Sequence, residues 1–204
     1  ENFLIWTKIP VTDIKKLNYL QKIGFYIVDT NVKLISSYIN IDKDVDHTNI
    51  RFAKPDDEKY VKDIAKNSFE HSRFHLDPEI PYNIACSIKE LWAKNFFLGR
   101  RGKWMVIAES NSEIVGFLQL TNKDDSTLVI DLIAVDKKFR GKGYAKKMIY
   151  YAYKNCLNKT DKVEVGTQIS NILSLDLYAR LGFKITSSYY VLHLHKKKQF
   201  NENR

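Results

Sequence analysis

The segment VDKKFRGKGYAKKM (135–148) holds two of the eight glycines of the chain, one residue apart, among six lysines and arginines. It overlaps the end of TLVIDLIAV (127–135), an almost uniformly apolar run that predicts a central strand buried on both faces. Glycine lets consecutive N–H groups converge, because no Cβ blocks close approach. A helix that begins at about Gly141 adds its unpaired N–H groups and the positive end of its dipole. The segment therefore predicts a cradle for a phosphate or pyrophosphate.

Other glycine-rich signatures fit this segment less well. A dinucleotide-binding GxGxxG fingerprint needs a third glycine at position 146, where the chain has Lys146, and no GxxxxGK[ST] motif is present. A nucleic-acid patch would use the basic residues but requires neither the glycines nor the buried strand. A flexible turn stays open on the glycines alone. The strand–loop–helix context favours the phosphate cradle.

Hydrophobic periodicity and turn residues divide residues 50–195 into alternating strands and helices. Pro55 followed by two aspartates is typical of a helix start, and Gly182 of a helix C-terminal cap. The expected strands are 50–54, 104–109, 113–120, 127–135 and 162–167, with a closing pair within 183–195; the expected helices are 55–69, one after Pro81, 141–158 and 171–181. This order predicts an α/β fold with a mixed central sheet and helices on both faces.

A polar stretch, 45–49, predicts a boundary between a small N-terminal α/β domain, 1–47, and a larger domain, 48–204. LNYLQKIGFYIV (17–28) aligns without gaps with LDLYARLGFKIT (175–186), which matches Gly24 with Gly182. Two explanations are open: a partial repeat, or the convergence expected of any helix that ends in glycine and leads into a strand. In this alignment Leu20 takes the place of Tyr178, so packing at that position does not require a hydroxyl.

The chain carries 33 basic and 24 acidic residues, a net charge of +9, which favours anionic partners. Its 44% apolar content supports a packed core, and no apolar run is long enough to span a bilayer. Cys86 and Cys156 fit buried free thiols, and no Cys/His pair has metal-ligand spacing. We expect a cytoplasmic protein without a metal site.

The pattern V-x-x-x-x-R-G-x-G-x-A (135–145), placed at the end of a hydrophobic strand, resembles the acetyl-CoA motif of the GCN5-related N-acetyltransferase (GNAT) family. IRFAKPDD (50–57) resembles the first strand and helix start of that family, and N-x-x-x-x-x-L-Y-x-R-L-G-F (171–183) resembles its last helix. The resemblance covers about residues 50–195. It implies the GNAT fold, acetyl-CoA as co-substrate and direct acyl transfer to a primary amine.

The same resemblance implies roles for individual residues. The backbone N–H groups of Ile133 and Val135 would hold the acetyl carbonyl, Asn171 would contact the pantetheine arm, and Tyr178 would protonate the leaving sulfur. A plain core aromatic is the alternative for Tyr178. The residues expected to bind acetyl-CoA are Ile133, Ala134, Val135, Arg140, Gly141, Lys142, Gly143, Tyr144, Ala145 and Asn171.

Three further segments resemble a narrower group, the dTDP-fucosamine acetyltransferases and their relatives: TKIPVTDIKKLNYLQKIGFYIVDT (7–30), HSRFHLDPEIP (71–81) and VGTQISN (165–171). That resemblance implies an acceptor of the class acetylated by those enzymes, the amine of a nucleotide-linked 4-amino-4,6-dideoxy sugar. Arg73 is then a candidate for the sugar-nucleotide phosphate. Asp131 is either a base that works through water or a structurally paired carboxylate.

The expected partner is therefore a small-molecule amine acceptor, a nucleotide-sugar. We expect neither nucleic acid nor a membrane as a partner, and a homodimer is left open. Two other functions are also open. One is acetylation of a protein or peptide amine, which an acidic acceptor groove would favour. The other is an inactive module of the same fold that binds CoA or RNA.

Overall fold

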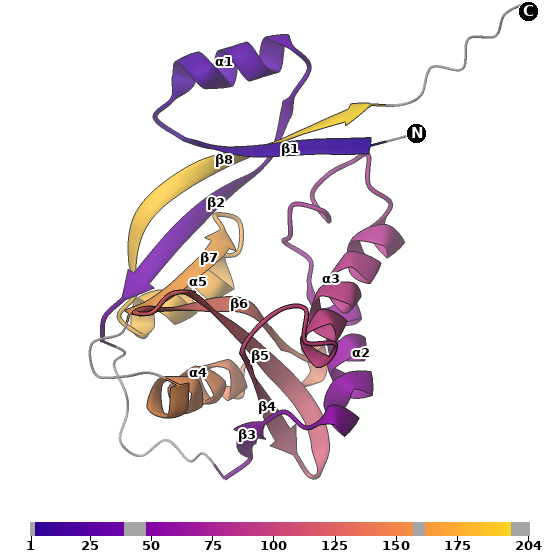
Figure 1. The fold of residues 1–204 in the computed structure, drawn as a ribbon, viewed down its shortest axis with the longest axis vertical. Helices are drawn as coiled ribbons and strands as arrows, with labels where there is room; N and C mark the ends of the chain where they lie inside the picture. Colours follow the sequence, from indigo (N-terminus) through magenta and orange to yellow (C-terminus); the bar gives the residue numbers. More distant parts are fainter. Residues whose placement is uncertain (1–2, 39–47, 157–161, 197–204) are drawn as a thin grey trace, which may run out of the picture.

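The computed structural model describes residues 3–38, 48–156 and 162–196, and it contains one mixed sheet of eight strands in the order β1-β8-β2-β7-β6-β5-β4-β3 (Figure 1). The strands are β1 (Phe3–Pro10), β2 (Tyr26–Ser36), β3 (Ile50–Phe52), β4 (Trp104–Ser110), β5 (Glu113–Asp124), β6 (Thr127–Val135), β7 (Lys162–Gln168) and β8 (Lys184–Lys196). The helices are α1 (Ile14–Lys22), α2 (Glu58–Ser68), α3 (Tyr82–Phe97), α4 (Tyr144–Cys156) and α5 (Ile172–Arg180). The predicted α/β class is confirmed.

Separate apolar clusters attach the helices to the sheet. Val61, Ile64 and Ala65 of α2 and Ala93 of α3 pack on Met105, Ile107, Phe117, Leu132 and Ala134 of the sheet. Residues of α4 and α5 pack in a second cluster, which contains Leu118, Ile130 and Val165. α2 and α3 thus cover one face and α4 and α5 the other (Figure 1). A third, smaller cluster of Ile9, Leu17 and Leu192 holds α1.

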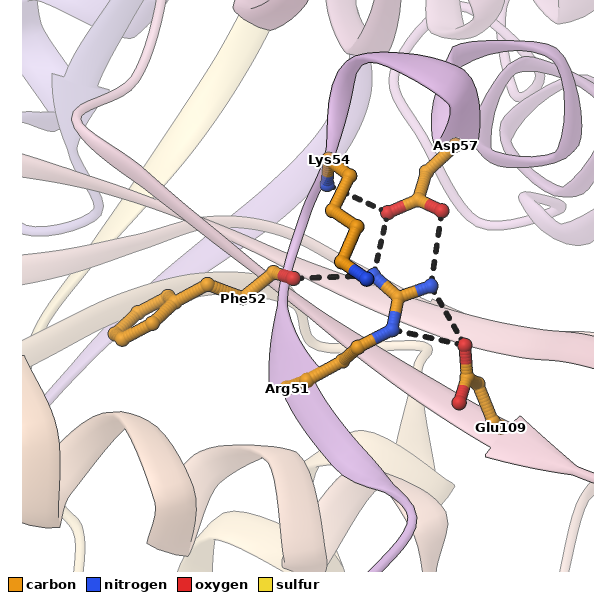
Figure 2. Close-up of polar contacts among 5 residues, drawn as sticks. All are labelled: Arg51, Phe52, Lys54, Asp57 and Glu109. Carbon is orange, nitrogen blue, oxygen red and sulfur yellow. Dashed lines mark hydrogen bonds and ion pairs between the residues drawn. The ribbon is translucent and has the colours of Figure 1, made fainter.

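The start of α2 is fixed by Arg51 of β3 (Figure 2). Its guanidinium bonds both oxygens of Asp57, at 2.7 and 2.9 Å, and Glu109 of β4 at 2.6 and 2.9 Å. Asp57 also accepts a hydrogen bond from the backbone N–H of Lys54 at 2.7 Å. Burial alone would raise the pKa of Asp57, but these partners lower it below its usual value. The network joins an edge strand, its neighbour and the first helical turn.

The closing pair of strands predicted within 183–195 is wrong. Residues 184–196 form one continuous strand, β8, and the N-terminal strand β2 lies between β8 and β7 (Figure 1). β2 pairs antiparallel with both of them. Strands from both sides of the predicted boundary at residue 47 therefore share one sheet. The boundary itself lies in 39–47, outside the described residues, and the two-domain division stays a prediction.

The pairings of β1 and β2 follow a regular rule. Lys8 of β1 lies opposite Val191 of β8, and Lys33 of β2 lies opposite Gly166 of β7. The two pairs are equivalent, because 8 and 166 differ by 158 and so do 33 and 191. The same offset relates the β1–β8 pairs from Ile5 to Pro10 to the β2–β7 pairs from Ser36 to Asn31. It also relates the two bulges of the β2–β8 ladder, at Val28 and Thr186. A pseudo-two-fold axis therefore relates two units, β1-α1-β2 and β7-α5-β8. The last strand of each unit pairs with the first strand of the other.

The helices of the two units obey the same offset. α1 runs from residue 14 to 22 and α5 from 172 to 180. Asp13 caps α1 through Lys16 N at 3.0 Å, and Asn171 caps α5 through Ser174 N at 3.3 Å. Both helices end at a glycine with positive φ, +96° at Gly24 and +88° at Gly182. The local sequence similarity of 17–28 and 175–186 thus accompanies the same geometry.

Candidate active site

Two neighbouring parallel strands separate in the middle of the sheet. β6 and β7 are paired from Thr127 and Lys162 to Ile130 and Val165, and no pairing follows. A bulge at Asp131 accompanies the separation, because Gln119 and Leu120 of β5 lie opposite Leu132 and Ile130. A bulge bends its strand away from its partner. Residues 131–135 and the end of β7 are therefore not paired with each other and mark an opening between the two strands.

Backbone donors of β6 line this opening. Asp136 N donates to Val115 O of β5 at 2.8 Å, so the alternate residues Val135 and Ile133 direct their N–H groups to the opposite edge, toward the opening. Ala134 lies opposite Phe117, and its side chain is buried in the cluster under α2 and α3. Ile133 and Val135 therefore present the donors that an acyl oxygen at this place would need.

The loop after β6 has the geometry of an anion cradle. Gly141 and Gly143 have φ of +77° and +81°, and a Cβ at either would meet no atom within 4 Å. Among the described residues, the N–H groups from Gly141 to Ala145 donate to no protein acceptor, and α4 begins at Tyr144. Unpaired amides at a helix start are suited to phosphate oxygens. The segment thus has the shape and donors that the pyrophosphate of acetyl-CoA would need.

The basic residues of the loop are partly engaged within the protein. Arg140 donates from Nη2 to Ser68 O at the end of α2, at 2.7 Å, and from Nε to Val135 O at 3.2 Å. Lys142 Nζ lies 5.0 Å from the centre of the Phe139 ring. Arg140 therefore ties the loop to β6 and α2. Its predicted contact with a cofactor phosphate stays a prediction.

Tyr178 of α5 is 2% exposed and packs against Phe183, with ring centres 5.4 Å apart. It belongs to the same apolar cluster as Ile133 and Val135, next to the opening. Burial raises the pKa of Tyr178, so the hydroxyl stays protonated at neutral pH and keeps a proton to donate. Asn171 uses its side-chain oxygen to cap α5, which leaves its NH₂ for another partner.

Asp131 is paired within the protein. Arg101 donates to both carboxylate oxygens at 2.6 Å, and Gln119 donates to Oδ2 at 2.9 Å. The sequence left two roles open for Asp131, a base that works through water or a structurally paired carboxylate, and the structure shows the paired carboxylate. The bidentate guanidinium occupies lone pairs that a base would use.

The α3 side of the sheet near the opening is lined by cations and aromatic rings. Trp92 lies between two of them, with Lys89 Nζ at 4.4 Å and Arg101 Cζ at 4.5 Å from its ring centre. Lys89 is 7% exposed, and burial lowers its pKa to about 8. The charge of Asp131 partly opposes this fall. Lys89 was not among the predicted site residues, although a lysine in line with the apolar Ala85 and Ala93 at helical spacing is a usable signal.

Arg73 extends this lining to the N-terminal strands. Its Cζ lies 3.6 Å from the ring centre of Trp6 on β1 and 4.7 Å from that of Phe74. Desolvation and the charge of Arg73 both lower the pKa of Lys8, and the same arginine acts on Lys89. The charge of Arg73, the predicted phosphate ligand, therefore acts on cations of both β1 and α3. Lys8 and Trp6 were not predicted, because only the tertiary structure brings them here.

A second polar group anchors the loop between α2 and α3. Asp77 accepts four hydrogen bonds, from Tyr26 Oη, Glu79 N, His193 Nδ1 and His195 Nε2, at 2.7, 2.9, 2.5 and 2.9 Å. Burial alone would raise the pKa of Asp77, but these bonds lower it to about 2. Asp77 and the two histidines lie at metal-ligand spacing. Every lone pair of the carboxylate is nevertheless occupied by a donor, so the group acts as a hydrogen-bonded anchor.

The two cysteines are free thiols. Burial raises the pKa of Cys156 to about 11, so it stays a thiol. Cys86 Sγ lies 3.7 Å from His75 Nε2, and His75 is also bonded to Ser72 at 2.6 Å. Within the described ranges, no helix combines the length and the hydropathy needed to cross a bilayer.

Comparisons with known proteins agree with this geometry. The chain is 28% identical over 205 residues to the spore coat polysaccharide biosynthesis protein SpsD of Bacillus subtilis, covering 98% of this chain and 69% of that protein. A putative GNAT acetyltransferase of Novosphingobium aromaticivorans superposes with a TM-score of 0.59 at 13% identity, over 96% of this chain and 74% of the other. A protein of unknown function from Staphylococcus epidermidis superposes with a TM-score of 0.62 at 16% identity, over 94% and 72%.

The family model of the GNAT acetyltransferases matches residues 60–183, which contain the opening between β6 and β7, the glycine loop and Tyr178. Members of that family use acetyl-CoA, and the cradle and the free donors of β6 fit it. The fold and this match together establish that the chain belongs to the GNAT acetyltransferase family and is an N-acetyltransferase.

Proposed function

We propose that the chain acetylates the primary amine of a nucleotide-linked 4-amino-dideoxy sugar by direct transfer from acetyl-CoA. The observation that carries the substrate class is the convergence of Lys8, Arg73, Lys89 and Arg101 on the α3 side of the opening. Arg73 depresses the pKa of both Lys8 and Lys89, so these charges repel one another in the free protein. A dianionic diphosphate would relieve that repulsion.

The aromatic rings beside these cations suit the rest of such an acceptor. Trp6 is 48% exposed although Arg73 covers one face of its ring, so it offers a surface to a base or a sugar. The relative SpsD is described as a polysaccharide biosynthesis protein, which supports a sugar acceptor. A cationic lining of this kind disfavours a basic peptide, because like charges would meet.

In the proposed mechanism, the loop amides from Gly141 to Ala145 hold the pyrophosphate of acetyl-CoA, and Asn171 contacts the pantetheine arm. The N–H groups of Ile133 and Val135 bind the acetyl oxygen and stabilise the negative charge that develops on it, an effect of about 3–4 kcal/mol for preorganised donors. The amine approaches from the α3 side of the sheet. Tyr178 lies in the cluster on the α4 and α5 side, and it protonates the leaving sulfur.

A product screen tests the substrate class. The protein is incubated with acetyl-CoA and a panel of dTDP- and UDP-linked amino sugars, the free amino sugars and a lysine peptide, and products are identified by mass spectrometry. We expect acetylation of a nucleotide-linked 4-amino sugar and none of the free sugar. Acetylation of the peptide alone would contradict the proposal.

Arg73→Ala tests the phosphate contact. We expect the KM for the nucleotide-sugar to rise at least 10-fold, since a charge-assisted contact to a phosphate is worth about 1.5–3 kcal/mol, while the KM for acetyl-CoA stays unchanged. Lys59→Ala, which removes one positive charge from an exposed position on α2, is the matched control and should change neither constant. A raised KM for acetyl-CoA with an unchanged KM for the nucleotide-sugar would instead assign Arg73 to the binding of acetyl-CoA.

A further inference from the structure

The proposed reaction needs a group that removes a proton from the amine, because an ammonium has no lone pair with which to attack. Asp131 is poorly suited, since Arg101 and Gln119 occupy its oxygens. Another carboxylate lies on the strand next to the opposite arm of the opening, β7. Asp29 of β2 is 7% exposed, and its Oδ2 has no hydrogen-bond partner among the described residues.

Strand pairing places Asp29 beside the end of β7. Ile169 N, directly after β7, donates to Thr30 O at 2.8 Å, and Asn31 lies opposite Gln168, the last residue of β7. The side chain of Gln168 lies close enough to the Asp29 carboxylate to oppose the rise of its pKa. Since β7 is the second arm of the opening, Asp29 lies beside the end of that arm.

Asp29 lies on the face of the sheet opposite to Tyr178. Alternation along β2 puts Asp29 and Asn31 on one face, where Lys8 Nζ donates to Asn31 Oδ1 at 3.1 Å. The next residue, Val32, packs on the other face in the same cluster as Tyr178. The proposed proton acceptor and the proposed proton donor therefore lie on opposite faces of the sheet.

The surroundings of Asp29 suit a proton acceptor. Burial raises its pKa to about 6, although the Gln168 side chain, the Thr30 N–H and the charges of Lys8 and Arg73 oppose that rise. Farther along β8 lies His193, whose Nδ1 is held by Asp77. A buried acceptor without a donor is destabilising, and an N–H of a bound substrate would supply the missing donor.

We propose that Asp29 is the catalytic base that accepts a proton from the substrate amine before it attacks the thioester. In this step the ammonium N–H bond breaks and the proton bonds to Asp29 Oδ2, which leaves the nitrogen lone pair free. The nitrogen then bonds the acetyl carbon, the C–S bond breaks, and Tyr178 protonates the sulfur. The second nitrogen proton replaces the one that Tyr178 gave, and the proton on Asp29 passes to solvent.

The inference rests on the proposed function and is tested by Asp29→Asn with the nucleotide-linked amino sugar that the screen identifies. We expect kcat/KM to fall about 10²–10³-fold at pH 7, the range usual for loss of a general base. The fall should shrink as the pH rises and the amine deprotonates without help. The wild-type decline in kcat/KM below about pH 6 should be absent, and the affinity for acetyl-CoA should be unchanged.

Two controls separate this role from a structural one. Asp56→Asn removes an exposed carboxylate near the start of α2 and should leave the profile as in the wild type. Asp29→Ser is a second variant in case the amide does not fold, because Ser187 occupies the equivalent place 158 residues later; it should show the same altered profile. A wild-type pH profile in either Asp29 variant would overturn the inference, whereas a wild-type protein that acetylates no amine would overturn the proposed function itself.

Discussion

Asn31 of β2 lies opposite Tyr189 of β8, at the point where the pseudo-two-fold axis crosses the sheet. The two residues are 158 positions apart, so each is the equivalent of the other. Asn31 also joins three strands, since its Nδ2 donates to Thr167 O of β7 at 2.9 Å and its Oδ1 accepts from Lys8 of β1. The units β1-α1-β2 and β7-α5-β8 are thus joined next to the proposed acceptor site.

Equivalent glycines should have equal importance for stability. Gly24→Ala and Gly182→Ala both force a side chain into the left-handed region, which costs about 1–2 kcal/mol. Urea unfolding should show a loss of this size for each variant. Gly166→Ala is the control, since its Cβ would meet Asn31 only at 3.6 Å, an ordinary contact, and it should be tolerated. A large loss in one variant and none in the other would argue against equivalence.

The loop glycines should affect cofactor binding beyond their effect on stability. Gly141→Ala and Gly143→Ala place a methyl group in the open space of the cradle and disfavour its positive φ. We expect the Kd for acetyl-CoA to rise about 10-fold or more, equal to about 1.4 kcal/mol, as measured by calorimetry. Gly99→Ala is a matched control, because Gly99 also has a positive φ, +66°, and no atom within 4 Å of its Cβ. It should lose similar stability and no affinity.

Tyr178→Phe should separate catalysis from packing. The ring that packs on Phe183 is retained and only the hydroxyl is lost. We expect kcat to fall about 10²-fold or more with the KM for acetyl-CoA and the melting temperature unchanged. Tyr153→Phe, on α4, should behave as the wild type. Unchanged turnover in Tyr178→Phe would leave Tyr178 as a core aromatic.

The Asp77 anchor should make stability depend on pH in acid. The folded pKa of Asp77, about 2, is below the usual value of about 3.9, so its contribution is complete above pH ~4 and is lost as the pH falls toward 2. Burial lowers the pKa of His193, which adds a loss as the pH falls below about 6.5. Asp77→Asn should cost about 1–3 kcal/mol at pH 7, because it removes a carboxylate that accepts hydrogen bonds from buried donors.

Urea unfolding between pH 7 and pH 3 measures this dependence. The Asp77→Asn curve should be flatter than that of the wild type below pH 4. Asp125→Asn, in the exposed turn between β5 and β6, should keep the wild-type curve. Parallel curves for Asp77→Asn and the wild type would show that the Asp77 carboxylate does not carry this dependence.

The sequence alone determined the parts of the molecule whose information is local. The run 127–135 and the glycine loop after it predicted a buried strand, a tight turn and a helix start, because apolar patterning and positive φ are properties of neighbouring residues. The same residues led to the acetyltransferase family. Most helices and strands after residue 50 lie within a few residues of their predicted limits.

Only the tertiary structure decided the order of the strands in the half of the sheet formed by β1, β8, β2 and β7. Nothing in the sequence of β2 specifies whether it pairs within its own unit or between β7 and β8, since strand pairing depends on long-range partners. That insertion brings Asp29, Lys8 and Trp6 next to Arg73 and the end of β7. The tertiary structure also decided that Asp131 is paired with Arg101, thirty residues earlier. The orientation of a buried charge is set by the partner that compensates its desolvation.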